Sequence, residues 1–176
     1  MEFAVVAVFV HRNDTLGLFV MRHSFGFHLL LFGHIIGAMT VVAGVIFAGG
    51  VLVRARRAET ALEVAVYLSL APLAVVMVVA GSVIVGVCGF WLVVVGGFGF
   101  GSGWVIAAIL LYVAVLGLGA LGGKAPKRAR LAARELGSDP ITPELRLLLW
   151  DRRSRWYNDV ALALMVVLVW LMVFKS

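Results

Sequence analysis

The stretch "HLLLFGHIIG", residues 28–37, lies inside the first long apolar segment of the chain, which covers residues 25–53 and ends at "RARR", residues 54–57. A helix needs about 20 apolar residues to cross the hydrocarbon core of a bilayer. The segment therefore predicts a membrane-spanning helix. It also carries two histidines, His28 and His34, at positions where only hydrocarbon is expected.

The composition indicates that the whole chain belongs in a membrane. Of its 176 residues, 63% are hydrophobic, and the mean hydropathy is +1.09, whereas soluble domains contain roughly 45–50% apolar residues. The formal charge of +6 is concentrated between the apolar segments. This pattern indicates control of topology and contact with anionic lipids, not with nucleic acid. The one cysteine, Cys88, excludes an intramolecular disulfide and a cysteine-based zinc site, and we expect a buried thiol.

Three further segments are long and apolar enough to span. The second covers residues 62–95 and contains Pro72, which predicts a kink because proline interrupts a helical hydrogen-bond ladder. The stretch "GGFGFGSG", residues 96–103, has five glycines in eight positions and predicts a tight loop. The third span covers residues 104–121 and the fourth residues 157–174. The sequence therefore predicts an all-α fold, a transmembrane four-helix bundle.

Residues 124–155, between the third and fourth spans, hold nine of the chain's 15 Lys and Arg residues. We expect short amphipathic helices here, one over residues 128–136 and one that begins with Thr142 as N-cap and Pro143 as the first helical residue. These helices would lie on the membrane surface and contact anionic lipids. The alternative is a solvated loop.

The first 20 residues need a separate interpretation. Residues 3–10, "FAVVAVFV", are too few to span a bilayer, and their flanks lack the features of a signal peptide. We expect residues 1–20 to form a peripheral leader, with Met21 as an alternative start of the native protein. A short segment on the membrane surface is the other interpretation. The four-span membrane domain then covers residues 21–176.

The basic residues also predict the orientation. The loop after the first span and the segment between the third and fourth spans lie on one side of a four-span layout and carry twelve Lys and Arg residues, against three on the other side. Because basic loops remain in the cytoplasm, we expect both termini outside. The five tryptophans fall near the two predicted membrane boundaries, as in an aromatic belt.

Small residues line one side of the first span. At about 100° per residue, Gly33, Gly37, Thr40 and Gly44 lie within roughly 60° of one another on a helix. Such a stripe lets another helix approach closely. We therefore expect helix packing on this side, and the alternative is room for a flat ligand.

The two histidines are the candidate ligands. His34 lies beside the glycine stripe, whereas His28 lies nearly on the opposite side and about 9 Å closer to the outer boundary. One ligand therefore cannot use both from one ideal helix. At its depth, neutral His34 needs a hydrogen-bond partner, either the backbone of a neighbouring helix or a hydroxyl such as Ser82 or Thr40. The alternative is that His34 or His28 binds haem b, or that His34 binds a metal ion.

Three other ionisable groups lie near span ends. We expect Glu63 and Asp159 to pair with arginines 54–57 or 152–155, with proton handling as the alternative. Lys175 ends the fourth span on the outer side and is expected to reach the headgroups. It lies on the same side as the histidines, so it is a further candidate for a shared site.

Motifs of soluble catalysis do not occur in the sequence. There is no HExxH, P-loop, GxSxG or CxxC pattern, and no inverted halves are detectable. The absence of catalytic motifs argues against an enzyme. The absence of inverted halves argues against a secondary transporter.

Residues 21–176 resemble an uncharacterised bacterial family of four-span, predicted integral membrane proteins. Four stretches carry the resemblance: the first span from His28, "HLLLFGHIIGAMTVVAGVIFAGG"; "VRARRA" after it; "GFGFGSGWVIAAILLY"; and the C-terminal "LMVFKS". The family usually ends in Phe-Lys-Pro, and Ser176 stands here in place of the proline.

That family is distantly similar to two better-understood groups, the haem-binding protoporphyrinogen oxidase and the copper-resistance membrane domain. The similarity implies a ligand role for His28 or His34 and a role for Lys175. The oxidase's arginine- and aromatic-rich first loop is absent from this chain.

These observations predict an integral membrane protein without catalysis of its own. We expect a bundle or a small subunit of a larger assembly in the bacterial cytoplasmic (inner) membrane, with other membrane proteins or a second copy as partners. The alternative is a haem- or metal-binding membrane redox protein that uses a first-span histidine. Transport of a small molecule is a weaker alternative.

Overall fold

The computed structural model describes residues 2–97 and 99–174, with side chains from Phe25 onward. Seven helices and no strand occur over these residues, which confirms the all-α prediction. The helices are α1 (Glu2–Arg56), α2 (Ala61–Ser69), α3 (Ala71–Val95), α4 (Gly103–Gly122), α5 (Lys124–Leu136), α6 (Pro143–Leu149) and α7 (Arg152–Val173).

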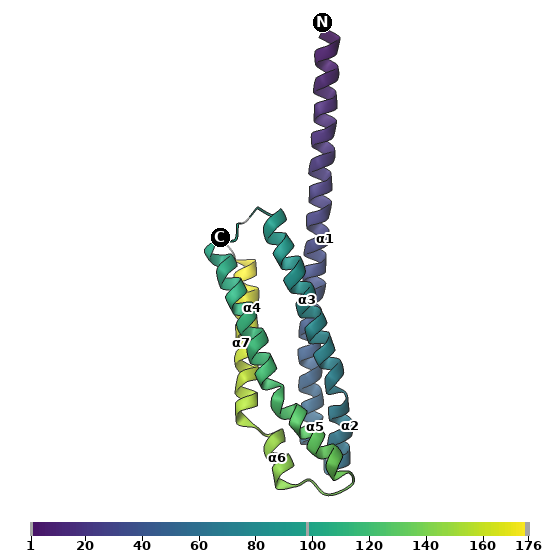
Figure 1. Ribbon diagram of the computed structural model, residues 1–176, viewed down its shortest axis with the longest axis vertical. Helices are drawn as coiled ribbons and strands as arrows, with labels where there is room; N and C mark the ends of the chain where they lie inside the picture. Colours follow the sequence, from purple (N-terminus) through teal and green to yellow (C-terminus); the bar gives the residue numbers. More distant parts are fainter. Residues whose placement is uncertain (1, 98, 175–176) are drawn as a thin grey trace.

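Four helical segments in the described part of the chain are long and apolar enough to cross a membrane. They are Phe25–Arg56, Ala61–Val95, Gly103–Leu136 and Pro143–Val173. The chain runs through them alternately down and up, and α1 lies beside α3 while α4 lies beside α7 (Figure 1). The predicted four-span bundle is therefore confirmed, and it consists of two antiparallel helix pairs.

The N-terminal part of α1 extends beyond the rest of the bundle (Figure 1). The helix begins at Glu2 and continues without a break into the first span. The proposal that residues 1–20 are a peripheral leader, and that the membrane domain begins at residue 21, stays a prediction.

The predicted kink in the second span is a break between two helices. α2 ends at Ser69, α3 begins at Ala71, and Leu70 joins them. Pro72 lies in the first turn of α3, where its missing N–H costs nothing because first-turn donors have no partner within the helix. The proline thus starts a helix and does not bend one.

The basic segment is more helical than the sequence predicts. α5 begins at Lys124 because Lys127 N donates to Gly123 O at 3.2 Å, and Pro126 is tolerated in the first turn. The predicted N-cap is confirmed, since the Thr142 hydroxyl accepts a hydrogen bond from Leu145 N at 3.3 Å. α7 begins before the predicted fourth span, because the Asp151 carboxylate caps it.

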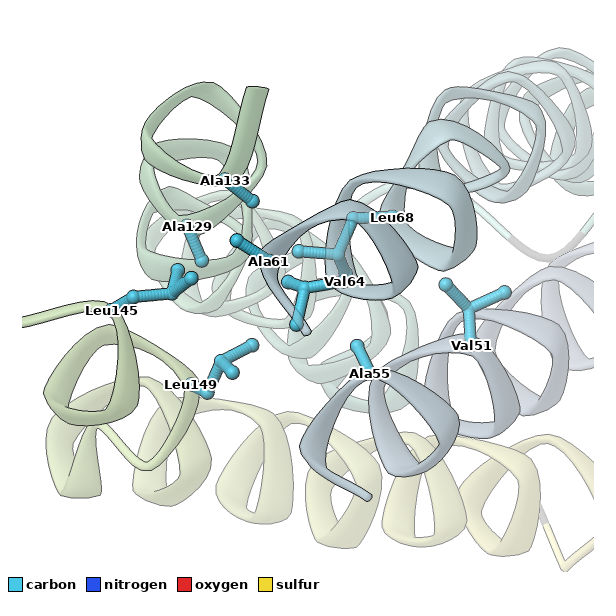
Figure 2. Packing of buried hydrophobic residues seen from close by; sticks show 9 residues of the cluster. All are labelled: Val51, Ala55, Ala61, Val64, Leu68, Ala129, Ala133, Leu145 and Leu149. Carbon is cyan, nitrogen blue, oxygen red and sulfur yellow. The ribbon is translucent and has the colours of Figure 1, made fainter. Parts of the chain in front are cut away.

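The best-packed core lies at one end of the bundle, formed by the last turns of α1 with α2, α5 and α6. We call this the basic end. The cluster consists of Val51, Ala55, Ala61, Val64, Leu68, Ala129, Ala133, Leu145 and Leu149, all less than 9% exposed (Figure 2). The predicted amphipathic helices are therefore present. The alanine face of α5 packs on α2 and is covered by this helix rather than by lipid.

Inside the predicted membrane region, α1 and α3 touch through their backbones. A Cβ atom built on Gly81 would lie 2.8 Å from Gly37 O, and one built on Gly37 would lie 3.0 Å from Gly81 O. A Cβ on Gly44 would lie 3.1 Å from Ala74 O. The approach at Gly81 leaves no room for a Cβ, and those at Gly37 and Gly44 are tighter than most Cβ contacts, so the glycines permit this helix contact.

We predict that Gly81→Ala lowers the free energy of unfolding by about 1–3 kcal/mol, because the new methyl group would overlap the Gly37 carbonyl. The matched control is Gly49→Ala in α1, where a Cβ meets nothing within 4 Å. It should be neutral or slightly stabilising, by less than about 1 kcal/mol. Unfolding in detergent measures both changes, and equal losses would contradict the backbone contact.

Candidate functional site

His34 lies deeper in the first span than His28, and it contacts α3. Its Nδ1 lies 3.0 Å from Val85 O, so Nδ1 carries the proton and donates it to the carbonyl of a neighbouring helix. The hydrogen-bond partner of His34 is therefore the backbone of a neighbouring helix, which is one of the partners expected from the sequence. The Thr40 hydroxyl instead donates to Ile36 O of its own helix at 2.8 Å.

A glycine makes room for the His34 ring. A Cβ on Gly89 would lie 3.1 Å from His34 Cε1 and 3.3 Å from Nδ1. In α3, Gly89 is four residues after Val85, so its N–H points at the same carbonyl. Because a carbonyl oxygen has two lone pairs, Val85 O can accept both the helical bond and the imidazole bond.

Tyr112 of α4 makes a similar contact with α3, about one turn before the contact of His34. Its hydroxyl donates to Ser82 O at 2.6 Å, and a Cβ on Gly86 would lie 3.2 Å from the same hydroxyl oxygen. Gly86 is again four residues after the accepting carbonyl. The two carbonyls are separated by about 4.5 Å along the helix axis. Thus α1 and α4 each contact α3 through a similar pair of a carbonyl and a glycine.

The second helix pair is joined in a related way. The Ser154 hydroxyl of α7 donates to Gly122 O of α4, and the Asn158 side chain occupies the space that a Cβ on Gly122 would need. Ser154 is 6% exposed. In each of these contacts a polar side chain bonds to the backbone of another helix at or near a glycine.

The predicted stripe on α1 faces α3 through its glycines. Gly37 and Gly44 are buried against α3, and a Cβ on Gly33 would lie 2.9 Å from Cys88 Sγ. Cys88 thus contributes its sulfur to this interface. Thr40 bonds within α1, as described above.

The other predicted site residues do not join His34. His28 makes an edge contact with the Phe27 ring at 6.1 Å between centroids. Six residues of helix separate it from His34, which corresponds to about 120° and 9 Å. Lys175 lies outside the described residues. Within the described part of the chain, no group of three or more His, Cys, Asp or Glu residues could hold a metal ion.

Glu63 has a capping role. Its Oε2 accepts a hydrogen bond from Glu59 N at 2.9 Å, and its own N–H donates to the Thr60 hydroxyl at 3.3 Å. This exchange is a variant of the capping box that fixes a helix start. Asp159 attracts Arg56 electrostatically, and the expected pairing of Glu63 and Asp159 with arginines stays a prediction.

Sequence reasoning missed Tyr112, Gly86 and Gly89. A tyrosine inside an apolar span is a signal, because its hydroxyl must find a partner in hydrocarbon. The pairing itself was beyond the sequence, since it depends on which helices are neighbours.

Comparison with known proteins gives one family. A family model described as "Predicted integral membrane protein (DUF2269)" matches residues 28–176, which is most of the chain. No curated protein and no solved structure matches the chain.

We predict that His34 and Gly89 are energetically coupled. His34→Ala removes one interhelical hydrogen bond and should cost about 0.6–1.7 kcal/mol. Gly89→Ala should also destabilise the native protein, since its methyl group would press on the imidazole, yet it should be harmless once the ring is gone. A double-mutant cycle measured by unfolding in detergent should show this coupling, and a cycle of His34→Ala with Gly49→Ala should be additive. Additivity in the first cycle would argue against the packing of the ring on Gly89.

Proposed function

This chain belongs to the DUF2269 family of predicted integral membrane proteins, and from that premise we propose that it works as a non-catalytic subunit of a larger membrane assembly. The observation that carries the proposal is that polar side chains at the helix contacts bond to backbone. His34, Tyr112 and Ser154 each bond to the backbone of another helix. Side chains engaged in holding helices together favour a structural role.

Glycines without a role inside the chain support the proposal. At the α1–α3 contact a neighbouring atom occupies the space beside each glycine, whereas a Cβ on Gly117 of α4 would meet nothing within 4 Å. A glycine costs roughly 1 kcal/mol relative to alanine in a helix. An exposed glycine in a span is compatible with close approach by a helix of another protein.

The surface of the spans supplies the area that a partner needs. In the most apolar window of each span, 17% of the residues are buried for the first three spans and 6% for the span that contains α7. The α4–α7 pair therefore includes the span with the least burial inside its own chain. We place the partner on this pair, at the outward face of α4 that contains Gly117.

We predict that the native protein co-purifies with a stoichiometric membrane partner in mild detergent. Gly117→Leu should release the partner, because the larger side chain blocks close approach, while Gly50→Leu, at another exposed glycine, should retain it. Mass analysis of the purified complex measures both. A native protein that purifies alone, as a monomer or as a homo-oligomer, would contradict the assembly.

A second candidate function is haem or metal binding at His34, and one observation favours it. Because Nδ1 donates to Val85 O, the proton is fixed there and Nε2 keeps the lone pair that ligates a metal. A histidine ligand usually has such a backbone bond at its other nitrogen. A pair of ligands from His28 and His34 does not fit, because the two residues point to different sides of α1. The role of Lys175 and the likeness to haem and copper proteins remain part of this proposal.

If His34 ligates haem, the purified protein shows a Soret band that His34→Ala abolishes and His28→Ala leaves in place. If His34 holds a metal, elemental analysis finds the ion and loses it in the same variant. A colourless, metal-free preparation with native fold would refute this candidate.

The orientation is proposed from the charges. The basic residues of α1's last turn and of α5 lie at the basic end, and the glycine-rich loop between α3 and α4 lies at the opposite end (Figure 1). Because basic segments are retained in the cytoplasm, we place the basic end inside a bacterial cytoplasmic membrane, with both termini outside.

Reporter fusions test this orientation. A fusion at Ser102 should report the outer side and a fusion at Arg130 the cytoplasmic side. The same side for both would refute the crossing by α4, and the reverse assignment would refute the orientation.

A further inference from the structure

Two arginines from different helices gather on one tryptophan at the basic end. Arg56 Cζ lies 5.2 Å from the centroid of the Trp150 ring, and Arg155 Cζ lies 5.6 Å from it. Arg56 ends α1, Trp150 caps the end of α6, and Arg155 lies in the first turn of α7. Attraction between a guanidinium and an aromatic face orients both groups. We call these three residues the Arg56–Trp150–Arg155 cluster.

Arg56 is fixed by the backbone of α6. Its Nε donates to Leu149 O at 2.8 Å, and Leu149 is 3% exposed within the core of the basic end. One donor of the guanidinium is therefore committed to the protein. Among the described residues no acceptor bonds to its two terminal nitrogens, so they are available for an acceptor from outside the chain.

Arg155 has a donor without an acceptor. Its Nε is buried and has no hydrogen-bond partner among the described residues, although the side chain as a whole is partly exposed. A charged group that loses water at one nitrogen without gaining a partner is destabilised. An anion at the exposed part of this guanidinium would not reach Nε, but it would neutralise the charge that has lost water there.

Carboxylates also lie near the cluster. Asp159 attracts Arg56, and Arg155 repels it. Asp151, directly after Trp150, caps α7 and accepts a hydrogen bond from Ser154 N. An anion would therefore be held by the guanidinium donors and not by an excess of positive charge.

The position of the cluster indicates what kind of anion fits. Arg56 follows the apolar part of α1, and Arg155 precedes the apolar part of α7. The Trp150 side chain is 53% exposed, as expected for an indole at the level of the headgroups. Val53, one turn before Arg56 and on a similar side of α1, is exposed and apolar. An anion at the cluster would therefore have an apolar side chain beside it on the membrane side.

We propose that Arg56, Trp150 and Arg155 form a binding site for the phosphate group of an anionic phospholipid. Guanidinium groups match phosphate oxygens in geometry and charge, and the exposed apolar side chain beside them receives the start of the acyl chains. The site specifies the expected contact with anionic lipid, using Trp150 and Arg155 of the basic segment together with Arg56 of α1. It is independent of the proposed assembly, because the purified chain alone carries it.

Native mass spectrometry of the full chain in detergent tests the site. Phosphatidylglycerol is titrated into the native protein and compared with phosphatidylcholine, which has the same chains but no net charge. Arg155→Gln removes one guanidinium and no hydrogen bond that holds the fold, and Arg56→Gln with Arg155→Gln removes both. The control is Arg152→Gln with Arg153→Gln, which removes two exposed charges from the same turn of α7.

We expect the native protein to bind phosphatidylglycerol at least about tenfold more tightly than phosphatidylcholine. The preference should fall severalfold in Arg155→Gln and disappear in the double variant, and it should persist in the control. Equal binding of the two lipids, or an equal loss in the control, would overturn the site. Displacement of phosphatidylglycerol by millimolar inorganic phosphate would also overturn it, since the site would then be one for free phosphate.

Discussion

The structure depends on the backbone contact between α1 and α3 at Gly37 and Gly81. Lipid is as apolar as leucine, so helices in a membrane gain little from burying hydrocarbon and must associate by close packing and hydrogen bonding. The two glycines let the carbonyl of each helix approach the other's Cα atom. This approach brings α3 near enough for the His34 imidazole to reach Val85 O and for Cys88 to fill the space at Gly33.

α3 then serves as the attachment point for the other pair. The carbonyls of Val85 and Ser82 each accept a side chain from a flanking helix, and the glycine four residues later leaves space for the ring. A polar residue in hydrocarbon is expensive unless it is bonded. Here the bond joins two helices. A polar residue that is unfavourable in lipid therefore determines which helix packs against its span. The basic end differs from the spans. Water there drives the burial of apolar side chains, so this end has an apolar core.

Sequence reasoning predicted the four spans and the Thr142 cap, because each depends on local chemistry or on apolar length, but near Pro72 it predicted a kink where the chain has a break between two helices. It also placed Gly33, Gly37 and Gly44 on one side of α1 and named a backbone or hydroxyl partner for His34, with ligation of haem or a metal as the alternative. It did not predict Tyr112 bonding to Ser82 O or the two arginines on Trp150. The spans are apolar on every side, so their periodicity does not tell which face meets which helix. Only the three-dimensional arrangement joins residues from α1, α6 and α7.

The contact between α1 and α3 can be tested directly, since the chain has one cysteine, Cys88. A Cβ on residue 33 would lie 2.9 Å from Cys88 Sγ, whereas a Cβ at Gly49 meets nothing within 4 Å. Oxidation of the Gly33→Cys protein in native membranes should therefore consume both thiols and form an intramolecular disulfide, and Gly49→Cys should keep its thiols free. Free thiols in Gly33→Cys under the same conditions, or an equal yield of the disulfide in Gly49→Cys, would contradict the packing of α1 on α3.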